Sequence, residues 1–131
     1  MTVSWAVKGY AGSSSESVID EWMFQATARA KGKFDARLRY LVSRLPTEWD
    51  DKYAHQLSGK CDGLFEIKFE ADGIAHRPLC FFGPSRFEFT IVLHAVEHND
   101  KLKPTDACQT GLKRKSEIGT GDNHPIVYDA Y

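Results

Sequence analysis

An Asp-Gly pair between two alternating apolar runs is the feature that most constrains how this chain can fold. In residues 65–82, FEIKFEADGIAHRPLCFF, Asp72-Gly73 separates the two runs. This dipeptide is the strongest short signal for a β-hairpin, because both positions of a type I′ turn need positive φ. Closing the hairpin with either a two-residue or a four-residue loop places Lys68 directly opposite Arg77. The sequence therefore predicts two strands that carry neighbouring cations.

The Lys68–Arg77 pair needs a physical explanation. Like charges directly opposite one another destabilise a ladder by some tenths of a kcal/mol. One explanation is an anion site, in which Arg77 contacts a phosphate through two N–H groups and Lys68 acts as a point charge. The alternative is a solvated ladder, in which Glu66 and Glu70 lie diagonally on the same face and neutralise both cations. The sequence leaves both explanations open.

Before the hairpin, the pattern predicts one strand followed by two helices packed as an αα-hairpin. Val3, Trp5 and Val7 alternate with smaller or polar residues. A Gly/Ser loop follows, with Ser15 as a candidate helix N-cap. The helical stripe weakens near Gly32, and Pro46 ends it because its ring cannot continue the hydrogen-bond ladder. The two apolar stripes are Val18, Ile19, Trp22, Met23 and Ala26, then Phe34, Leu38, Leu41, Val42 and Leu45.

After a polar loop, the pattern predicts strands at 64–71, 74–82 and 86–96 and a short helix at 104–117. Pro78 lies inside a strand and cannot donate a ladder bond, so a bulge or an open edge is expected there. The order is β-α-α-β-β-β-α, an α+β fold with a small antiparallel sheet and helices on one face. Residues 1–118 form a single domain. Residues 119–131 form a flexible tail, in which Ile126, Val127 and Tyr128 are able to dock.

Composition limits the function classes. The chain of 131 residues has 17 Lys and Arg against 18 Asp and Glu, so a nucleic-acid site must be a local patch. The cations on the helices form either a solvated face or a surface for a polyanion or acidic partner. Three cysteines without close spacing predict reduced thiols rather than a disulfide framework or zinc cluster. No signal-peptide pattern or long apolar run is seen, which predicts a cytoplasmic protein without membrane contact.

The second half of the chain resembles the RelE/HigB toxin superfamily, and within it the phage-derived, toxin-like branch. The similarity covers roughly residues 55–118. It consists of a Leu-x-Gly motif, a motif that opens the hairpin, a cation in the next strand, an apolar strand, and a helix opened by proline after a short basic connection. Here these are Leu57-Ser58-Gly59, Gly63-Leu64-Phe65-Glu66-Ile67-Lys68, Arg77, FTIVLHAVE and Lys103-Pro104-Thr105-Asp106-Ala107.

The resemblance implies a RelE/ParE-like fold and the toxin of a type II toxin–antitoxin pair. Such a toxin is an endoribonuclease, or RNA interferase, that cleaves mRNA on the ribosome. Its implied partner is an antitoxin, a helix-turn-helix protein from the adjacent gene, so the chain is a monomer or part of a complex with that antitoxin. An acidic, disordered antitoxin segment would cover the apolar stripe that begins at Val18 and the nearby cations.

Metal-free RNA cleavage uses the 2′-OH of the substrate as nucleophile, so neither a metal nor another cofactor is expected. The protein supplies a base, an acid and fixed cations for the charge that builds on the phosphate. The candidate catalytic residues are Lys68, Arg77, His94 and His98. The candidate RNA-binding residues are Lys60, Arg86, Lys101 and Lys103, and His55 is a further candidate RNA contact.

A structural role is the alternative for each histidine of the strands. Strict alternation places His94 with Glu88, Thr90 and Val92, and it places His76 on the core side. Two family features are absent: His98-Asn99 stands where many relatives carry Lys-Lys, and GLKRKSEI lacks the tyrosine that some members place near the last helix. The alternative function is a catalytically idle protein that acts by binding a protein partner, as the ParE branch binds gyrase. A third is a phage-derived structural or regulatory protein.

Overall fold

The Asp72-Gly73 turn forms the predicted hairpin. In the computed structural model, which describes residues 3–131, the two turn residues have φ values of 55° and 75°. β4 (Phe69–Ala71) pairs with β5 (Ile74–Phe82), so that Ala71 lies opposite Ile74. β3 (Phe65–Ile67) pairs with β5 in the same register. Lys68 interrupts the strand between β3 and β4, at the position that this register sets opposite Arg77.

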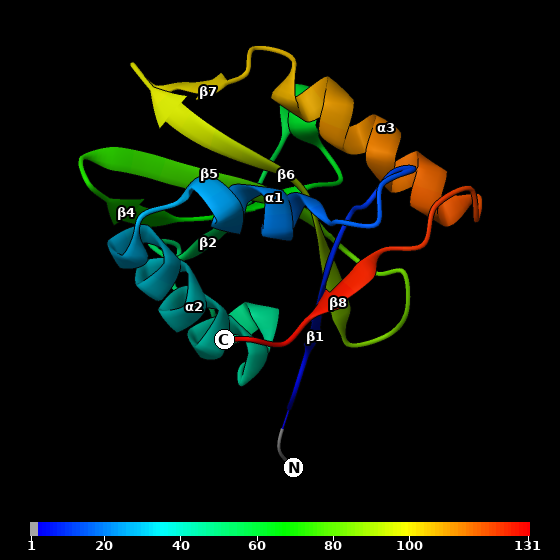
Figure 1. Cartoon of the computed structure of the whole chain (residues 1–131), viewed down its shortest axis with the longest axis horizontal. Helices are drawn as coiled ribbons and strands as arrows, with labels where there is room; N and C mark the ends of the chain where they lie inside the picture. The colour runs from blue at the N-terminus through cyan, green and yellow to red at the C-terminus, as the bar shows by residue number, and fades with distance from the viewer. Residues whose placement is uncertain (1–2) are drawn as a thin grey trace.

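The fold is α+β, with a larger sheet than the sequence predicts. Its eight strands follow the order β2-β3-β5-β6-β1-β8, with β4 on β5 and β7 on β6 (Figure 1). The sheet is also mixed rather than antiparallel, because β1 pairs with β6 in parallel. The remaining strands are β1 (Ala6–Gly9), β2 (Ala54–Gln56), β6 (Glu88–His98), β7 (Lys101–Lys103) and β8 (Ile126–Tyr128).

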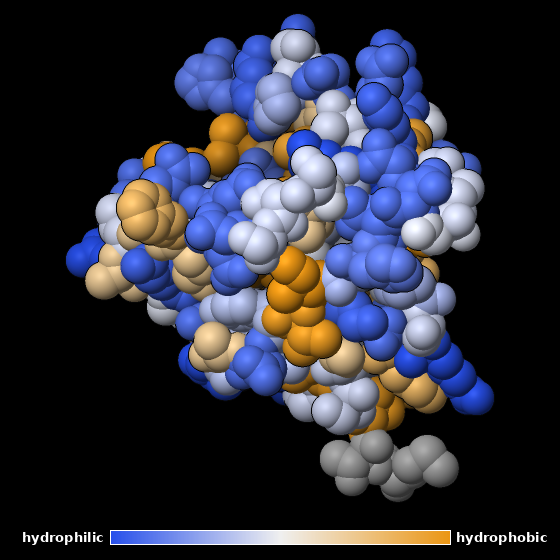
Figure 2. Space-filling view, turned by 45° about the vertical axis from the view of Figure 1, so that its right-hand side comes forward, coloured by the Kyte–Doolittle hydropathy of each residue, from blue (hydrophilic) through white to orange (hydrophobic). Residues whose placement is uncertain are grey.

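β8 lies within the segment that the sequence predicts to be a flexible tail. It pairs with β1 and forms one edge of the sheet, and Tyr128 Oη donates a hydrogen bond of 2.6 Å to Asp35 Oδ1. Val127 remains 56% exposed on this edge. Figure 2 shows the side of the molecule on which β8 lies, where a narrow apolar strip is surrounded by hydrophilic residues. Residues 126–128 therefore form the edge strand beside β1.

The helices begin and end at residues that cap them. α1 (Val18–Gln25) starts after Ser17 rather than Ser15, because Ser17 Oγ accepts a hydrogen bond from the Asp20 N–H. Thr27 caps α2 (Ala28–Val42) through the Ala30 N–H, so the two helices separate before Thr27 and not near Gly32. The other helices are η1 (Pro46–Glu48), η2 (Gly59–Cys61) and α3 (Ala107–Gly119). No helix within residues 3–131 is long and apolar enough to cross a bilayer.

Helices cover both faces of the sheet, whereas the sequence predicts them on one (Figure 1). α1 and α2 bury their stripes against a core that includes Phe65, Phe69 and Phe89. α3 covers a second core on the opposite face, which includes Leu79 and Val92. The α1 stripe is therefore largely used inside the fold: Ile19 is 2% and Trp22 is 7% exposed. The expectation that this stripe awaits a partner is corrected by its burial, and Phe24 is the exposed apolar residue of α1.

A β-bulge lies directly after Pro78, where the sequence predicts a bulge or an open edge. Leu79 lies opposite Leu93, but Cys80 lies opposite Ile91, so Val92 is an extra residue in β6. An extra residue reverses the alternation of side chains beyond it. Val92 accordingly packs in the α3 core, whereas the His94 ring stacks on Trp22 of α1. Strict alternation predicts that His94 and Val92 share a face of the sheet, and this prediction is wrong.

A disulfide joins Cys61 of η2 to Cys108 of α3, and Cys80 is a buried free thiol. The prediction of reduced cysteines is thus wrong for two of the three. The sequence spacing gave no sign of this bond, because 47 residues separate its cysteines and only the tertiary fold brings them together. The bond fixes η2, which carries Lys60, to the first turn of α3.

Removal of this disulfide is expected to lower the free energy of unfolding by about 2–4 kcal/mol, because the crosslink limits the conformations of the unfolded chain. The measurement is urea unfolding of the oxidised wild type and of a Cys61→Ser, Cys108→Ser variant. Repeating both experiments in excess dithiothreitol is the control, since the difference should then nearly vanish. Equal stability of the two oxidised proteins would contradict the stabilising role.

Candidate functional site

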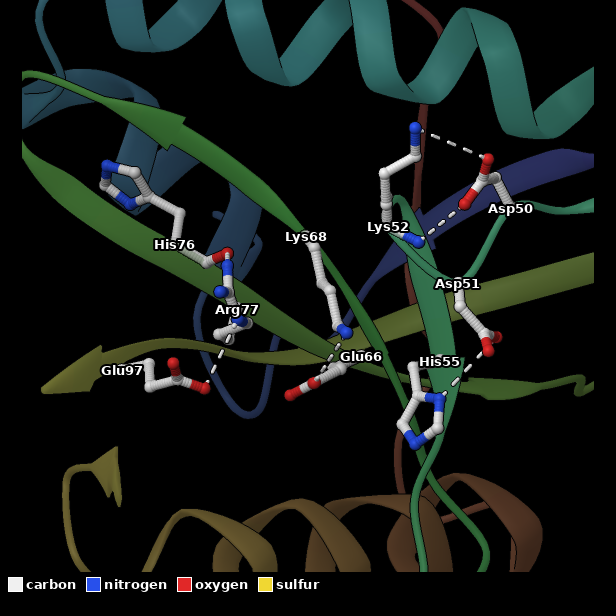
Figure 3. Close-up of polar contacts among 9 residues, drawn as sticks. All are labelled: Asp50, Asp51, Lys52, His55, Glu66, Lys68, His76, Arg77 and Glu97. Carbon is white, nitrogen blue, oxygen red and sulfur yellow. Dashed lines mark hydrogen bonds and ion pairs between the residues drawn. The ribbon is translucent and has the colours of Figure 1, made fainter. Parts of the chain in front are cut away.

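Four charged side chains meet where Lys68 interrupts the hairpin strand (Figure 3). We call Glu66, Lys68, Arg77 and Glu97 the charged quartet. Lys68 Nζ lies 4.0 Å from Glu66 Oε1, and Arg77 Nε lies 3.6 Å from Glu97 Oε1. The predicted proximity of the two cations therefore comes with a carboxylate for each. Glu66 is one of the neutralising groups that the ladder explanation named, but the partner of Arg77 is Glu97 rather than Glu70.

Arg77 is buried, and its guanidinium is incompletely satisfied. The residue is 8% exposed, and Nη1 donates a hydrogen bond of 2.9 Å to the carbonyl oxygen of His76. Within residues 3–131, the buried Nε atom has no hydrogen-bond partner. A buried donor without an acceptor is costly, by about 1–3 kcal/mol. Arg77 is therefore a buried cation that is held by Glu97 and by the His76 carbonyl oxygen, with its Nε–H group left without a hydrogen bond.

Lys68 and Arg77 also line a cavity of about 290 Å³, which we call the cation cavity. Five cations face this space against a single carboxylate, so its electrostatic potential favours anions. They come from α2, from the loop before β2 and from the hairpin. The cations are Lys33, Arg37, Lys52, Lys68 and Arg77, and the carboxylate is Glu70.

Arg37 is held in place at the wall of the cation cavity. Its Nε donates a hydrogen bond of 2.8 Å to the carbonyl oxygen of Lys68, and its guanidinium carbon lies 3.7 Å from the centre of the Tyr53 ring. These contacts join α2 to the hairpin at the interruption. They also show that part of the basic surface of α2 belongs to a structured cavity. The sequence identified these helix cations only as a general surface.

Glu66 is a buried carboxyl group between the two cations. It is 7% exposed, and its burial raises its pKa, although the charges of Arg77 and Lys68 oppose this effect. His55 lies opposite Glu66 on β2, and its Nδ1 is 3.7 Å from Asp51 Oδ1. A carboxyl group with a raised pKa beside fixed cations is suited to accept a proton. Sequence reasoning did not single out Glu66 as a candidate base, because the alternating pattern did not reveal its burial.

His94 lies apart from the charged quartet, on the opposite face of the sheet. Its ring stacks on Trp22 with centroids 4.2 Å apart, and its Nε2 is 2.9 Å from Nδ1 of His76. Burial and the neighbouring His76 lower the pKa of His94 to about 3. The ring is therefore neutral near pH 7, which favours the structural role. His76 is buried in the same core, as the sequence predicts.

Three other candidate residues are exposed and lie together on β6 and β7, apart from the charged quartet. His98 lies opposite Lys101, and Lys103 lies opposite Val96. Since Glu97 points towards Arg77, alternation places these three side chains on the other face of the sheet. The structure thus brings the candidate residues together in two separate groups, Lys68 with Arg77 and His98 with Lys101 and Lys103.

Lys60 and Arg86 lie elsewhere. Lys60 belongs to η2, beside the disulfide, where it lines a separate cavity with residues of the first turn of α3. Arg86 lies in the β5–β6 loop, with its guanidinium carbon 4.9 Å from the centre of the Phe87 ring. This loop joins the end of β5 that is distant from Arg77. Neither residue belongs to the cation cavity.

The chain was compared with known proteins, and its side chains with the ligand sets that hold metal ions. Within residues 3–131, no three His, Cys, Asp or Glu side chains are grouped so that they could hold a metal ion. No protein-family model, curated protein or solved structure matches this chain.

Proposed function

We propose that this chain is a toxin of the RelE/HigB kind, a metal-independent endoribonuclease that holds an mRNA phosphate in the cation cavity. The observation that carries the proposal is the convergence of five cations on one cavity, with Lys68 and Arg77 of the charged quartet among them. A phosphodiester supplies the acceptor oxygens that such donors need. The order of the helices and the central hairpin supports the RelE/ParE-like assignment, together with the motifs at residues 57–68 and 103–107.

Cleavage would use the 2′-OH of the substrate as nucleophile. Glu66 takes the proton of the 2′-OH, and the 2′-oxygen attacks phosphorus. Lys68 and Arg77 stabilise the negative charge that develops on the phosphate oxygens. The bond from phosphorus to the 5′-oxygen then breaks, and His55, opposite Glu66, donates the proton that this oxygen needs. The products are a 2′,3′-cyclic phosphate and a 5′-hydroxyl end.

The partners belong to the same proposal: ribosome-bound mRNA in the cytoplasm, and an antitoxin that holds the toxin inactive. Because the apolar stripe of α1 is buried, an acidic antitoxin segment would bind the exposed cations of α2 and Phe24 instead. Phe24 is 93% exposed, and Arg29, Lys33 and Arg39 are exposed on α2. Such contacts pair opposite charges around one apolar anchor.

A second function from a different class is a catalytically idle protein that acts by binding a protein partner. Two observations favour it: each cation of the charged quartet already has a carboxylate within 4.0 Å, and His94 is neutral and remote. In that case the quartet is a structural ladder. Expression experiments separate the two functions.

Expression of the chain without a partner is expected to stop growth and to produce mRNA fragments that end in a 2′,3′-cyclic or 3′-phosphate. Lys68→Ala should abolish cleavage and weaken RNA binding about tenfold, since it removes a cation whose side chain is 27% exposed. Lys113→Ala is the matched control, because it removes the same charge from an exposed position of α3. Sequencing of RNA ends gives the measurement.

Each alternative has its own outcome. Growth arrest with intact mRNA would favour the catalytically idle protein. Normal growth with intact mRNA at high expression would contradict the endoribonuclease. Arg77→Ala is a poorer test than Lys68→Ala, because Arg77 is buried and pairs with Glu97, so its loss would lower stability as well as activity.

A further inference from the structure

A second cavity at the same edge of the sheet has aromatic walls. It encloses about 150 Å³, and we call it the aromatic pocket. Trp49, Phe65 and Phe82 form its walls, and Asp51, His55 and Gln56 contribute polar groups to its lining. The Phe82 ring stacks on Phe65 with centroids 4.4 Å apart and on Trp49 with centroids 5.7 Å apart. The pocket thus combines flat apolar walls with a few polar side chains.

The walls of the aromatic pocket are fixed, but one of them remains accessible. Trp49 Nε1 donates a hydrogen bond of 3.1 Å to the carbonyl oxygen of Leu41, which holds the indole ring. Phe65 is buried, whereas Phe82 is 41% exposed. A large aromatic side chain exposed to this extent, yet packed on two other rings, leaves part of its surface accessible to a ligand. Packing of the core alone does not require the Phe82 side chain to be exposed.

We propose that the aromatic pocket binds one nucleobase of the RNA whose phosphate occupies the cation cavity. This inference rests on the proposed function. A cavity of about 150 Å³ accepts a ligand the size of a single aromatic ring. Stacking on aromatic side chains stabilises any base, because every base has a π-face. Asp51 accepts hydrogen bonds, and the amide of Gln56 both donates and accepts them, so these side chains can contact the polar edge of the base.

The positions of the two cavities fit one strand of RNA. Asp51 lines the aromatic pocket, and the next residue, Lys52, lines the cation cavity. On the sheet, His55 of the aromatic pocket lies opposite Glu66, two residues before Lys68. Two residues of a strand span about 7 Å, which is a separation that a single nucleotide can bridge. A phosphate on Lys52 and Lys68 therefore leaves its base within reach of the end of the pocket that Asp51 and His55 line.

NMR titrations of the full chain with adenosine 5′-monophosphate and with ribose 5-phosphate test the proposal. The two ligands share the phosphate and the sugar, so their difference reports the base. The nucleotide is expected to bind at least about fivefold more tightly, since stacking on aromatic side chains favours each base by about that factor or more. Equal affinities in the wild type would overturn the aromatic pocket as a base site.

Phe82→Leu should remove most of this preference and leave the affinity for ribose 5-phosphate unchanged. Phe87→Leu is the matched control, because Phe87 is 39% exposed and packs on Trp5 but does not line the pocket. If Phe82→Leu melts at a much lower temperature, Gln56→Ala replaces it. Gln56 is exposed, and its truncation should change the ranking of the four nucleoside monophosphates. A preference that both variants retain would contradict the proposal.

The proposed function and the proposed base site can be contradicted by different results. If Lys68→Ala binds ribose 5-phosphate as tightly as the wild type, the cation cavity is not the phosphate site and the proposed function is wrong. If Lys68→Ala weakens both ligands but the nucleotide has no advantage in the wild type, the cation cavity stands and the base site is wrong. A wild-type chain that binds neither ligand at millimolar concentration contradicts both.

Discussion

Replacement of Glu66 with glutamine is expected to slow RNA cleavage by about 10²- to 10⁴-fold, the range that a positioned general base contributes. Glutamine has nearly the same shape as glutamate but cannot accept the proton of the 2′-OH. RNA binding should persist, because Lys68 and Arg77 remain, and the loss of a negative charge beside them favours an anion. Cleavage of a short RNA, measured in a single turnover, separates this effect from binding.

The same change should leave stability unchanged or slightly raised. Burial raises the pKa of Glu66, so the fold favours the neutral form of this side chain over the charged one. Glutamine is neutral at every pH and avoids that penalty. Cleavage by the wild type should also fall as the pH decreases through the raised pKa of Glu66, because only the carboxylate acts as a base.

Glu70→Gln is the matched control. Glu70 belongs to the same hairpin and is exposed at the cation cavity, so its replacement should leave the cleavage step intact. If Glu66→Gln cleaves at the wild-type rate, Glu66 is only a ladder partner of Lys68. A large loss of stability in Glu66→Gln would instead show that the carboxylate holds the hairpin together.

The hairpin and the cation pair were predictable because their determinants are local. Asp72-Gly73 sets a two-residue turn, and the turn sets the register for every residue of β3 and β4. The relation between Lys68 and Arg77 then follows from counting. Pro78 likewise predicted an irregular strand pairing, because a proline has no N–H group to donate to the ladder, whatever its surroundings.

The parts that sequence reasoning missed depend on contacts between distant segments. The bulge takes its extra residue, Val92, from β6 rather than from the strand that carries Pro78. Nothing near Val92 signals this, yet it decides which face His94 occupies. Cys61 and Cys108 are likewise distant in sequence and meet only in the folded protein. The strand Ile126–Tyr128 is short, so its pattern did not distinguish it from a docked tail.

The same division applies to the candidate site. Lys68 and Arg77 could be predicted from the hairpin, but the cavity around them includes Lys33, Arg37 and Lys52 from a helix and a loop. The positions of these three residues depend on how α2 and the loop pack on the sheet. Periodicity alone does not determine that packing. The role of Glu66 depends on burial, and the aromatic pocket depends on rings from three separate segments. Tertiary packing, rather than local pattern, assembles these sites.

Acid is expected to destabilise the protein through a pair of packed histidines, the buried His76 and the half-buried His94. His76 Nδ1 and His94 Nε2 lie 2.9 Å apart, between the rings of Phe69 and Trp22. Burial lowers the pKa of both, that of His94 to about 3; Asp72 raises the pKa of His76 and Arg77 lowers it. The unfolded chain therefore binds protons at a pH where the folded protein does not.

The sign of the effect follows from proton linkage. Stability that depends on neutral His94 is fully present above about pH 6.5, the pKa of an unperturbed histidine, and is lost as the pH falls towards about 3. The pKa difference corresponds to as much as about 5 kcal/mol. Urea unfolding at a series of pH values between 7 and about 4 measures this loss, with the steepest part below the pKa of free histidine.

His94→Gln should flatten the acid limb of the stability profile, because glutamine keeps a hydrogen-bonding group beside His76 but does not titrate. His98→Gln is the control, since His98 is exposed at the end of β6 and makes no contribution to the buried pair. An acid limb that is equally steep in wild type and His94→Gln would show that carboxyl groups or His76 alone cause the loss. The combination of a flattened limb in His94→Gln and an unchanged one in His98→Gln would assign acid sensitivity to the core and separate it from any proton transfer at the charged quartet.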